Sequence, residues 1–180
     1  MNALVHSPVG LIHFIAAALA LISGALVLLW PKATRRHIRV GYVYTASMCI
    51  MLVTAFAIYN LYGSFGVFHW LALVSTATLA GGMVPVLLKR PVHTYVVLHF
   101  SFMYWSVVGL YMAFAAETLV RLPQVVIEGG VPNRTFYTMV IGSMVVLGIV
   151  ANVIWYRMKP RWMEQFGTQA VLQEQEAGGG

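Results

Sequence analysis

Two histidines and a glutamate stand inside apolar stretches of the sequence, where an ionisable side chain is costly. His13 lies in "GLIHFIAAALALISG", His69 lies in "GSFGVFHWLALVSTATLAGG", and Glu117 follows "GLYMAFAA". Imidazole binds haem iron, zinc and copper, and carboxylate binds the latter two. An ionisable residue at membrane depth usually faces the interior of a helix bundle and has a partner there. The three residues therefore define a candidate cofactor or metal site.

The composition places these stretches in a membrane. Of the 180 residues, 60% are hydrophobic and 9% are charged, whereas about 25% of the residues in a soluble domain are charged. The acidic residues are all glutamates, which excludes mechanisms that need a pair of aspartates. The single cysteine, Cys49, excludes an intrachain disulfide and a CxxC metal site.

Five stretches are long enough to cross a bilayer, which takes about 20 mostly apolar residues. They cover residues 9–30, 40–62, 67–88, 92–118 and 136–156. We predict an all-α integral membrane bundle of five transmembrane helices within residues 1–160. Residues 161–180 are predicted to form a polar cytoplasmic tail that is partly disordered.

Most of the basic residues lie in loops on one side of this predicted bundle. They are Lys32, Arg35, Arg36, Arg39, Lys89, Arg90, Arg157, Lys159 and Arg161. By the positive-inside rule these loops face the cytoplasm, so the N-terminus lies outside and the C-terminus inside. The net charge of +6 is thereby explained through orientation and contact with anionic lipid. It indicates no nucleic-acid partner.

Helix geometry places the three candidate groups in one layer below the outer surface. At about 1.5 Å per residue, His13 lies roughly 7 Å, His69 roughly 5 Å and Glu117 roughly 8 Å below it. A stripe of small residues continues from His13 along the first helix through Ala17, Ala20 and Gly24. Such stripes let membrane helices approach closely, so this face is predicted to point inward.

Each of these residues also has a purely structural explanation. A histidine can bond a carbonyl or hydroxyl group of a neighbouring helix, and Glu117 can pair with Arg121 four residues further on. His37 and His99 lie nearer the cytoplasmic boundary, where His99 can be a cofactor ligand, a proton relay or a core histidine. Apart from the single pair Met48 and Met51, the methionines show no MxxM spacing, which favours core packing over copper binding.

Three stretches carry a resemblance to a family of bacterial polytopic membrane proteins, known as a predicted membrane domain of unknown function. They are "HFIAAALALISGALVLLWPKATRRHIRVGYVY", "FGVFHWLALVSTATLAGG" and "HFSFMYWSVVGLYMAFAAETLVRLP". The residues that fall on the family's motif positions are His13, His37, His69, His99, Glu117 and Arg121. The resemblance implies the same topology in a bacterial cytoplasmic membrane, and it supplies no activity.

The first functional hypothesis is electron transfer through a b-type haem. His13 and His69 would be its axial ligands in the outer leaflet. Glu117 and Arg121 would hold a propionate, a proton or a quinol, and the partner would be a quinone or a membrane redox complex. A second, inner site would use His99 with His37 or His93.

Two further hypotheses use the same sequence differently. In one, His13, His69 and Glu117 bind zinc or copper. In the other, the chain has no chemistry of its own and is an accessory or assembly subunit of a larger membrane complex. The sequence contains no Gly-x-Ser-x-Gly, HExxH or Walker pattern that would indicate a soluble-type catalytic centre.

Overall fold

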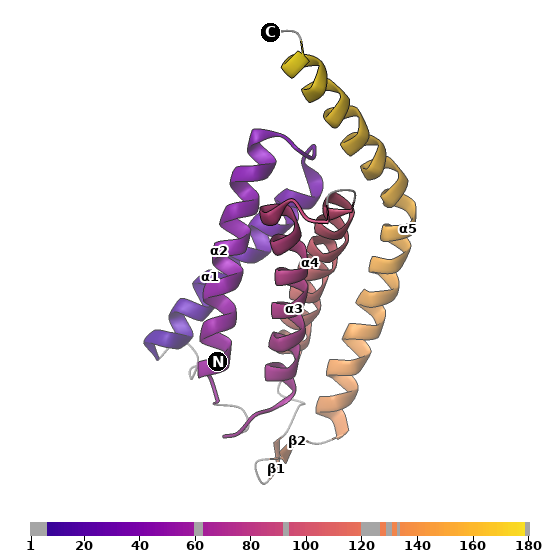
Figure 1. Ribbon diagram of the computed structural model, residues 1–180. Coiled ribbons are helices and arrows are strands. Elements are labelled where there is room, and N and C mark those ends of the chain that lie inside the picture. Colours follow the sequence, from indigo (N-terminus) through magenta and orange to yellow (C-terminus); the bar gives the residue numbers. More distant parts are fainter. Residues whose placement is uncertain are drawn as a thin grey trace.

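The apolar stretches form helices that pack side by side as a bundle (Figure 1). The computed structural model describes residues 7–59, 63–91, 94–119, 127–128, 131–132 and 134–178, with only the backbone beyond residue 164. The helices are α1 Pro8–Leu29, α2 Arg35–Ala57, α3 Val67–Leu88, α4 Tyr95–Leu119 and α5 Arg134–Gly178. Among the described residues, five helices are long and apolar enough to span a bilayer. This confirms the predicted five-helix membrane bundle.

Between α4 and α5 lie two short strands, β1 Ile127–Glu128 and β2 Val131–Pro132. They pair antiparallel, with Ile127 opposite Pro132 and Glu128 opposite Val131. We call this end of the bundle the hairpin end. The opposite end, where residues 30–34 join α1 to α2 and residues 89–94 join α3 to α4, is called the basic end; it is uppermost in Figure 1.

The helix ends follow from their capping residues. Ser7 caps α1 by accepting the Gly10 N–H at 2.9 Å, and Thr34 caps α2 by accepting the His37 N–H at 3.2 Å. Because Thr34 can cap in this way, α2 starts at Arg35, before the predicted residue 40. It ends at Ala57 instead of the predicted residue 62. The first turn of α2 therefore contains His37.

The last helix is longer than the span predicted from hydropathy at residues 136–156. α5 continues through Pro160 as far as Gly178; the partial disorder of residues 161–180 stays a prediction. Its part that can span a membrane is Arg134–Glu164. The remainder reaches beyond the other helices at the basic end (Figure 1). The polar composition of this segment thus does not end the helix.

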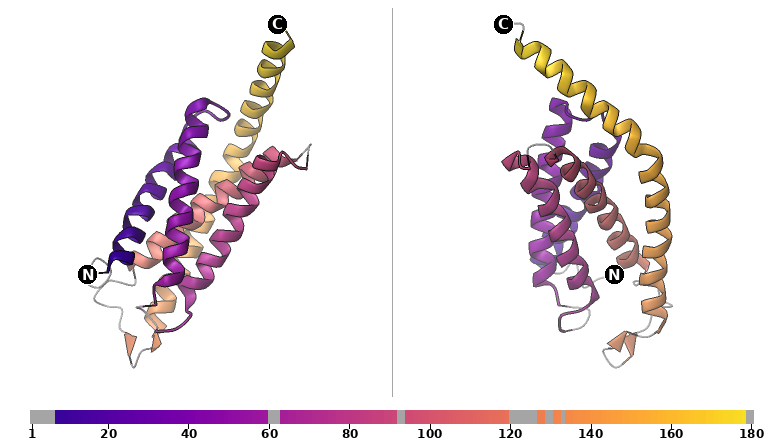
Figure 2. Two further views of the ribbon diagram at one scale, coloured as in Figure 1. Left: turned by 60° about the vertical axis from the view of Figure 1, so that its left-hand side comes forward. Right: turned by 45° about the vertical axis from the view of Figure 1, so that its right-hand side comes forward.

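The bundle consists of two helical hairpins, α1–α2 and α3–α4, with α5 lying along α4 (Figure 2). α1 also touches α4, and α2 touches α3, whereas α1 and α3 share no extensive contact. The arrangement decides which side chains can meet. A residue of α1 reaches α2 or α4 directly, but it does not reach α3 across the bundle.

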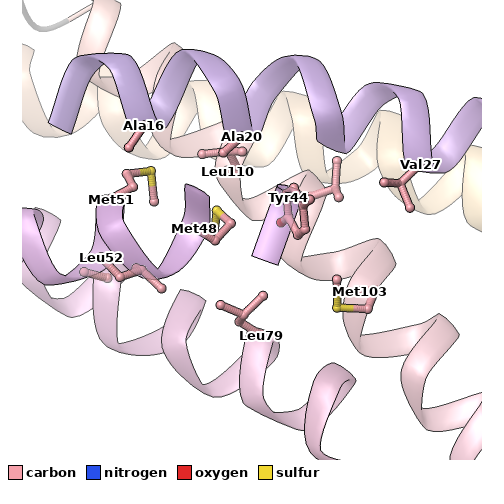
Figure 3. Close-up of a cluster of buried hydrophobic side chains, with 12 residues drawn as sticks. Ala16, Ala20, Val27, Tyr44, Met48, Met51, Leu52, Leu79, Met103 and Leu110 are labelled. Carbon is pink, nitrogen blue, oxygen red and sulfur yellow. The ribbon is translucent and has the colours of Figure 1, made fainter. Parts of the chain in front are cut away.

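The core lies between α1, α2, α3 and α4, and Figure 3 shows its central side chains. Ala20, Tyr44 and Met48 are fully buried there. A Cβ atom on Gly24 would lie 3.1 Å from Tyr44 and 3.3 Å from Val107, so a larger residue there would make these side chains shift by a few tenths of an ångström. The predicted small-residue stripe and the predicted role of methionine in core packing are both confirmed.

Candidate functional site

His13 faces its hairpin partner α2. Its Nδ1 lies 3.1 Å from the Met51 carbonyl oxygen and 3.0 Å from the Thr54 hydroxyl. The Thr54 hydroxyl donates its own proton to carbonyls of α2, and a carbonyl can only accept. Nδ1 therefore carries the proton and donates it, which leaves the Nε2 lone pair of His13 available. The small-residue stripe sets this outcome, because it packs α1 against α2.

His69 is held in the opposite protonation pattern. It is the third residue of α3, and its Nδ1 accepts the backbone N–H of Gly66 at 3.1 Å. A neutral imidazole that accepts at Nδ1 carries its proton at Nε2. This Nε2 is buried and has no hydrogen-bond partner among the described residues. In this arrangement His69 can donate a hydrogen bond but cannot bind a metal through Nε2.

The surroundings of His69 come from the α2–α3 connection. Tyr59 stacks on its ring at 4.6 Å and Phe65 at 4.9 Å between ring centroids. Only 4% of His69 is exposed. The sequence contains a signal for this role that we did not use: a polar side chain three residues after a helix N-cap can bond back to the N-cap N–H. "GVFH" places His69 at that position.

The predicted metal site of His13, His69 and Glu117 is not formed. His13 and His69 lie on α1 and α3, which share no extensive contact, and the described residues contain no group of three His, Cys, Asp or Glu side chains placed to hold a metal ion. Glu117 is partly buried near the end of α4. Arg121 lies outside the described residues, so its pairing with Glu117 stays a prediction.

His99, at the basic end, does have the arrangement expected of a ligand. Its Nδ1 lies 2.9 Å from the Gly82 carbonyl oxygen of α3, so Nδ1 carries the proton and the Nε2 lone pair is available. Histidines that bind metals usually donate their other N–H to a carbonyl or a carboxylate in this way.

His37 is the neighbour of His99. It lies in the first turn of α2, bonded to the backbone carbonyl of Val27, and it interacts electrostatically with Lys32 and His99. Its Nδ1 is buried and has no hydrogen-bond partner within the described part of the chain. We call Lys32, His37 and His99 the inner cluster. His93 lies outside the described residues.

Lys32 closes the inner cluster at the end of α1. Its ammonium group donates to the carbonyls of Val27 at 2.7 Å, Leu28 at 2.6 Å and Trp30 at 3.2 Å. It also lies 5.5 Å from the Trp162 ring centroid. The side chain is 4% exposed, and burial lowers the pKa of Lys32 to about 8. From the sequence we used Lys32 only to predict the orientation of the bundle in the membrane. A lysine just after a helix end can also cap the last carbonyl groups of that helix.

Aromatic rings from α4 and α5 extend from the inner cluster. Phe100, next to His99, stacks on Trp155 with 4.9 Å between ring centroids, and Trp162 meets Phe100 edge-on at 5.2 Å. Tyr104 belongs to the same group and donates to the Ala151 carbonyl at 2.6 Å. The basic end therefore combines two imidazoles, one buried cation and an aromatic wall.

Comparison with known proteins adds no assignment: no protein-family model matches the chain, and neither a curated protein nor a solved structure is similar to it. The resemblance to the bacterial membrane family thus stays a prediction from the residues that carry it.

Proposed function

We propose that the chain is a bacterial cytoplasmic membrane protein that binds a b-type haem and transfers electrons. The N-terminus would lie outside and the C-terminus in the cytoplasm, in agreement with the basic residues at one end. The residues that would hold the haem iron are His37 and His99 of the inner cluster. This differs from the outer pair His13 and His69, because His69 presents an N–H, not a lone pair, at Nε2.

The observation that carries the proposal is that two imidazoles from different helices lie close enough at the basic end to interact electrostatically. His99 is oriented by the Gly82 carbonyl so that its Nε2 lone pair is available. His37 contributes a buried nitrogen that has no partner among the described residues. A buried polar atom without a hydrogen bond costs about 1–3 kcal/mol, so a ligand that occupies it would stabilise the fold.

The residues around this pair would serve the bound group in distinct ways. A haem supplies a one-electron couple whose potential depends on its axial ligands and on the polarity around it. The Gly82 carbonyl would fix the ring orientation of His99 and raise its basicity. Lys32 would keep positive charge beside the site, and the rings of Phe100, Trp155 and Trp162 would restrict access of water.

A quinone dissolved in the bilayer or a membrane redox complex would be the electron partner. Both are reached laterally from the membrane, and the inner cluster lies near the end of the spanning segments. Glu117, at the other end of α4, would have a separate role in proton handling.

An absorption spectrum tests the proposal directly. Protein purified from cells with an ample supply of haem should show a Soret band, and reduction with dithionite should give the sharp bands of a six-coordinate b-type haem. Metal analysis of the same sample is the control. A colourless protein, or one that holds zinc or copper without haem, would contradict the proposal; a colourless protein that co-purifies in fixed ratio with a membrane complex would favour the accessory-subunit hypothesis.

A further inference from the structure

A cavity of about 330 Å³ opens at the basic end, beside the connection between α1 and α2. Its lining residues are Trp30, Pro31, Thr34, Arg35 and Arg36. Apolar atoms form most of its wall, although two arginines stand at it. None of the lining residues belongs to the inner cluster, so the cavity is a separate feature of the fold.

Hydrogen bonds hold the wall of this cavity in place. The Thr34 hydroxyl donates to the Pro31 carbonyl at 3.1 Å and accepts the His37 N–H at 3.2 Å. On the other side, the ammonium group of Lys32 binds the Trp30 carbonyl at 3.2 Å. Because both ends of the connection are tied to the helices, the cavity is formed before any ligand enters.

The charge at the cavity is positive. Arg35 and Arg36 are exposed, and neither makes an ion pair with another described residue. They are the first residues of α2, whose first turn contains no acidic residue. The N-terminus of a helix adds a partial positive charge of its own. An anionic group is therefore attracted to this position.

We propose that the cavity binds an anionic phospholipid, with its phosphate at Arg35 and Arg36 and its glycerol and first acyl carbons against Trp30 and Pro31. Tryptophan is enriched at the level of the lipid head groups, which places the cavity where such a phosphate lies. The apolar wall favours a lipid over free phosphate, because inorganic phosphate would leave that surface without a partner. The proposal does not depend on haem binding.

Native mass spectrometry of the full chain in detergent tests this site. Wild-type protein should retain phosphatidylglycerol in preference to phosphatidylcholine. The double variant Arg35→Gln/Arg36→Gln should retain it at least about tenfold less well, because two basic residues near a lipid surface are lost. The control Lys89→Gln/Arg90→Gln removes the same charge at the same end of the bundle and should stay close to wild type.

Further variants separate the site from general charge effects. Arg35→Lys/Arg36→Lys should keep most of the retention, because it keeps the charge, and Trp30→Ala should lower it without a change in charge. Equal retention by wild type and Arg35→Gln/Arg36→Gln, or equal loss in the Lys89/Arg90 control, would overturn the proposal. Displacement of the lipid by excess inorganic phosphate would overturn it too, since the site would then be one for free phosphate.

Discussion

At the scale of single residues, the hydrogen-bond partner of each histidine decides its chemistry. His13 and His99 donate from Nδ1 to carbonyls of neighbouring helices, so each presents a lone pair at Nε2. His69 accepts at Nδ1 and presents an N–H instead. Imidazoles inside membrane-spanning helices therefore serve as a potential ligand in two cases and as a hydrogen-bond donor in the third.

The capping role of His69 gives the first prediction. Replacement by alanine leaves the Gly66 N–H without its partner, which should lower the free energy of unfolding by about 1 kcal/mol. His69→Gln should be less damaging, because glutamine at this position can reach back to the N-cap N–H. Unfolding of both variants in mixed detergent micelles measures the difference. Equal destabilisation by alanine and glutamine would show that the bond to Gly66 does not matter.

Lys32 makes stability depend on pH. Burial lowers its pKa from 10.5 to about 8, so between these values the unfolded chain binds a proton that the folded chain has released. The free energy of unfolding must then rise as pH increases across this window. The penalty of burying the charge is fully present below pH 8 and disappears above pH 10.5.

The corresponding measurement compares wild type with Lys32→Met from pH 7.5 to pH 10.5 in the same detergent. The free energy of unfolding of wild type minus that of Lys32→Met should increase by up to about 3 kcal/mol as the pH rises over this range. All other ionisable groups are the same in both proteins, so their contribution cancels in the difference. A difference that stays constant with pH would mean that Lys32 keeps its ordinary pKa.

At the scale of helices, close approach at glycine sets the geometry of α1 and α2. Gly24 lies against Tyr44 and Val107, and Tyr44 in turn bonds Ser106 of α4 at 2.8 Å. Gly24 thus lets α1 pack closely against α2 and α4 at the place where Tyr44 and Ser106 form a buried hydrogen bond. The same contact brings His13 against α2, which is why it does not face α3.

A matched pair of glycines tests this packing. Gly24→Leu should destabilise the bundle by about 1–3 kcal/mol, because the added side chain has no room beside Tyr44 and Val107. Gly41→Leu is the control: a Cβ at Gly41 meets no atom within 4 Å, and leucine is a better helix former than glycine. If both variants unfold alike, the close contact of α1 with α2 and α4 does not exist as described.

The sequence predicts where the helices lie along the chain better than it predicts which helices contact one another. The helices follow from hydropathy because a bilayer requires each crossing segment to satisfy its own backbone hydrogen bonds. The pairing of His13 with Met51 and Thr54 depends on which helix the Gly24 stripe contacts, and one sequence does not specify that. The start of α2 at Arg35 was predictable from the Thr34 cap, and it is what brings His37 beside His99.

At the scale of the whole molecule, function divides between the two ends of the bundle. The basic end holds the inner cluster and the proposed lipid cavity, whereas the hairpin end holds His13, His69 and Glu117. As predicted, His13, His69 and Glu117 lie near the hairpin end of their helices, and their depth in a membrane stays a prediction. Their convergence is not seen in the described residues, because helices at opposite sides of a bundle can share a depth without sharing a site.

The orientation of the bundle is a prediction at this scale. In a Cys49→Ser background, a membrane-impermeant thiol reagent should label Ala3→Cys in intact cells. It should label Gly180→Cys only after the membrane is opened, because the positive-inside rule places the C-terminus in the cytoplasm. The reverse pattern of labelling would contradict the proposed topology and move the basic end to the outer face.

The most direct test of the central claim is a panel of four histidine variants examined by absorption spectroscopy at equal protein concentration. His37→Ala and His99→Ala should lose the Soret band or show a five-coordinate spectrum, because each removes one axial ligand. His13→Ala and His69→Ala should keep the wild-type spectrum, since their contacts are structural. A panel in which His13→Ala and His69→Ala lose the band while His37→Ala and His99→Ala keep it would contradict the account.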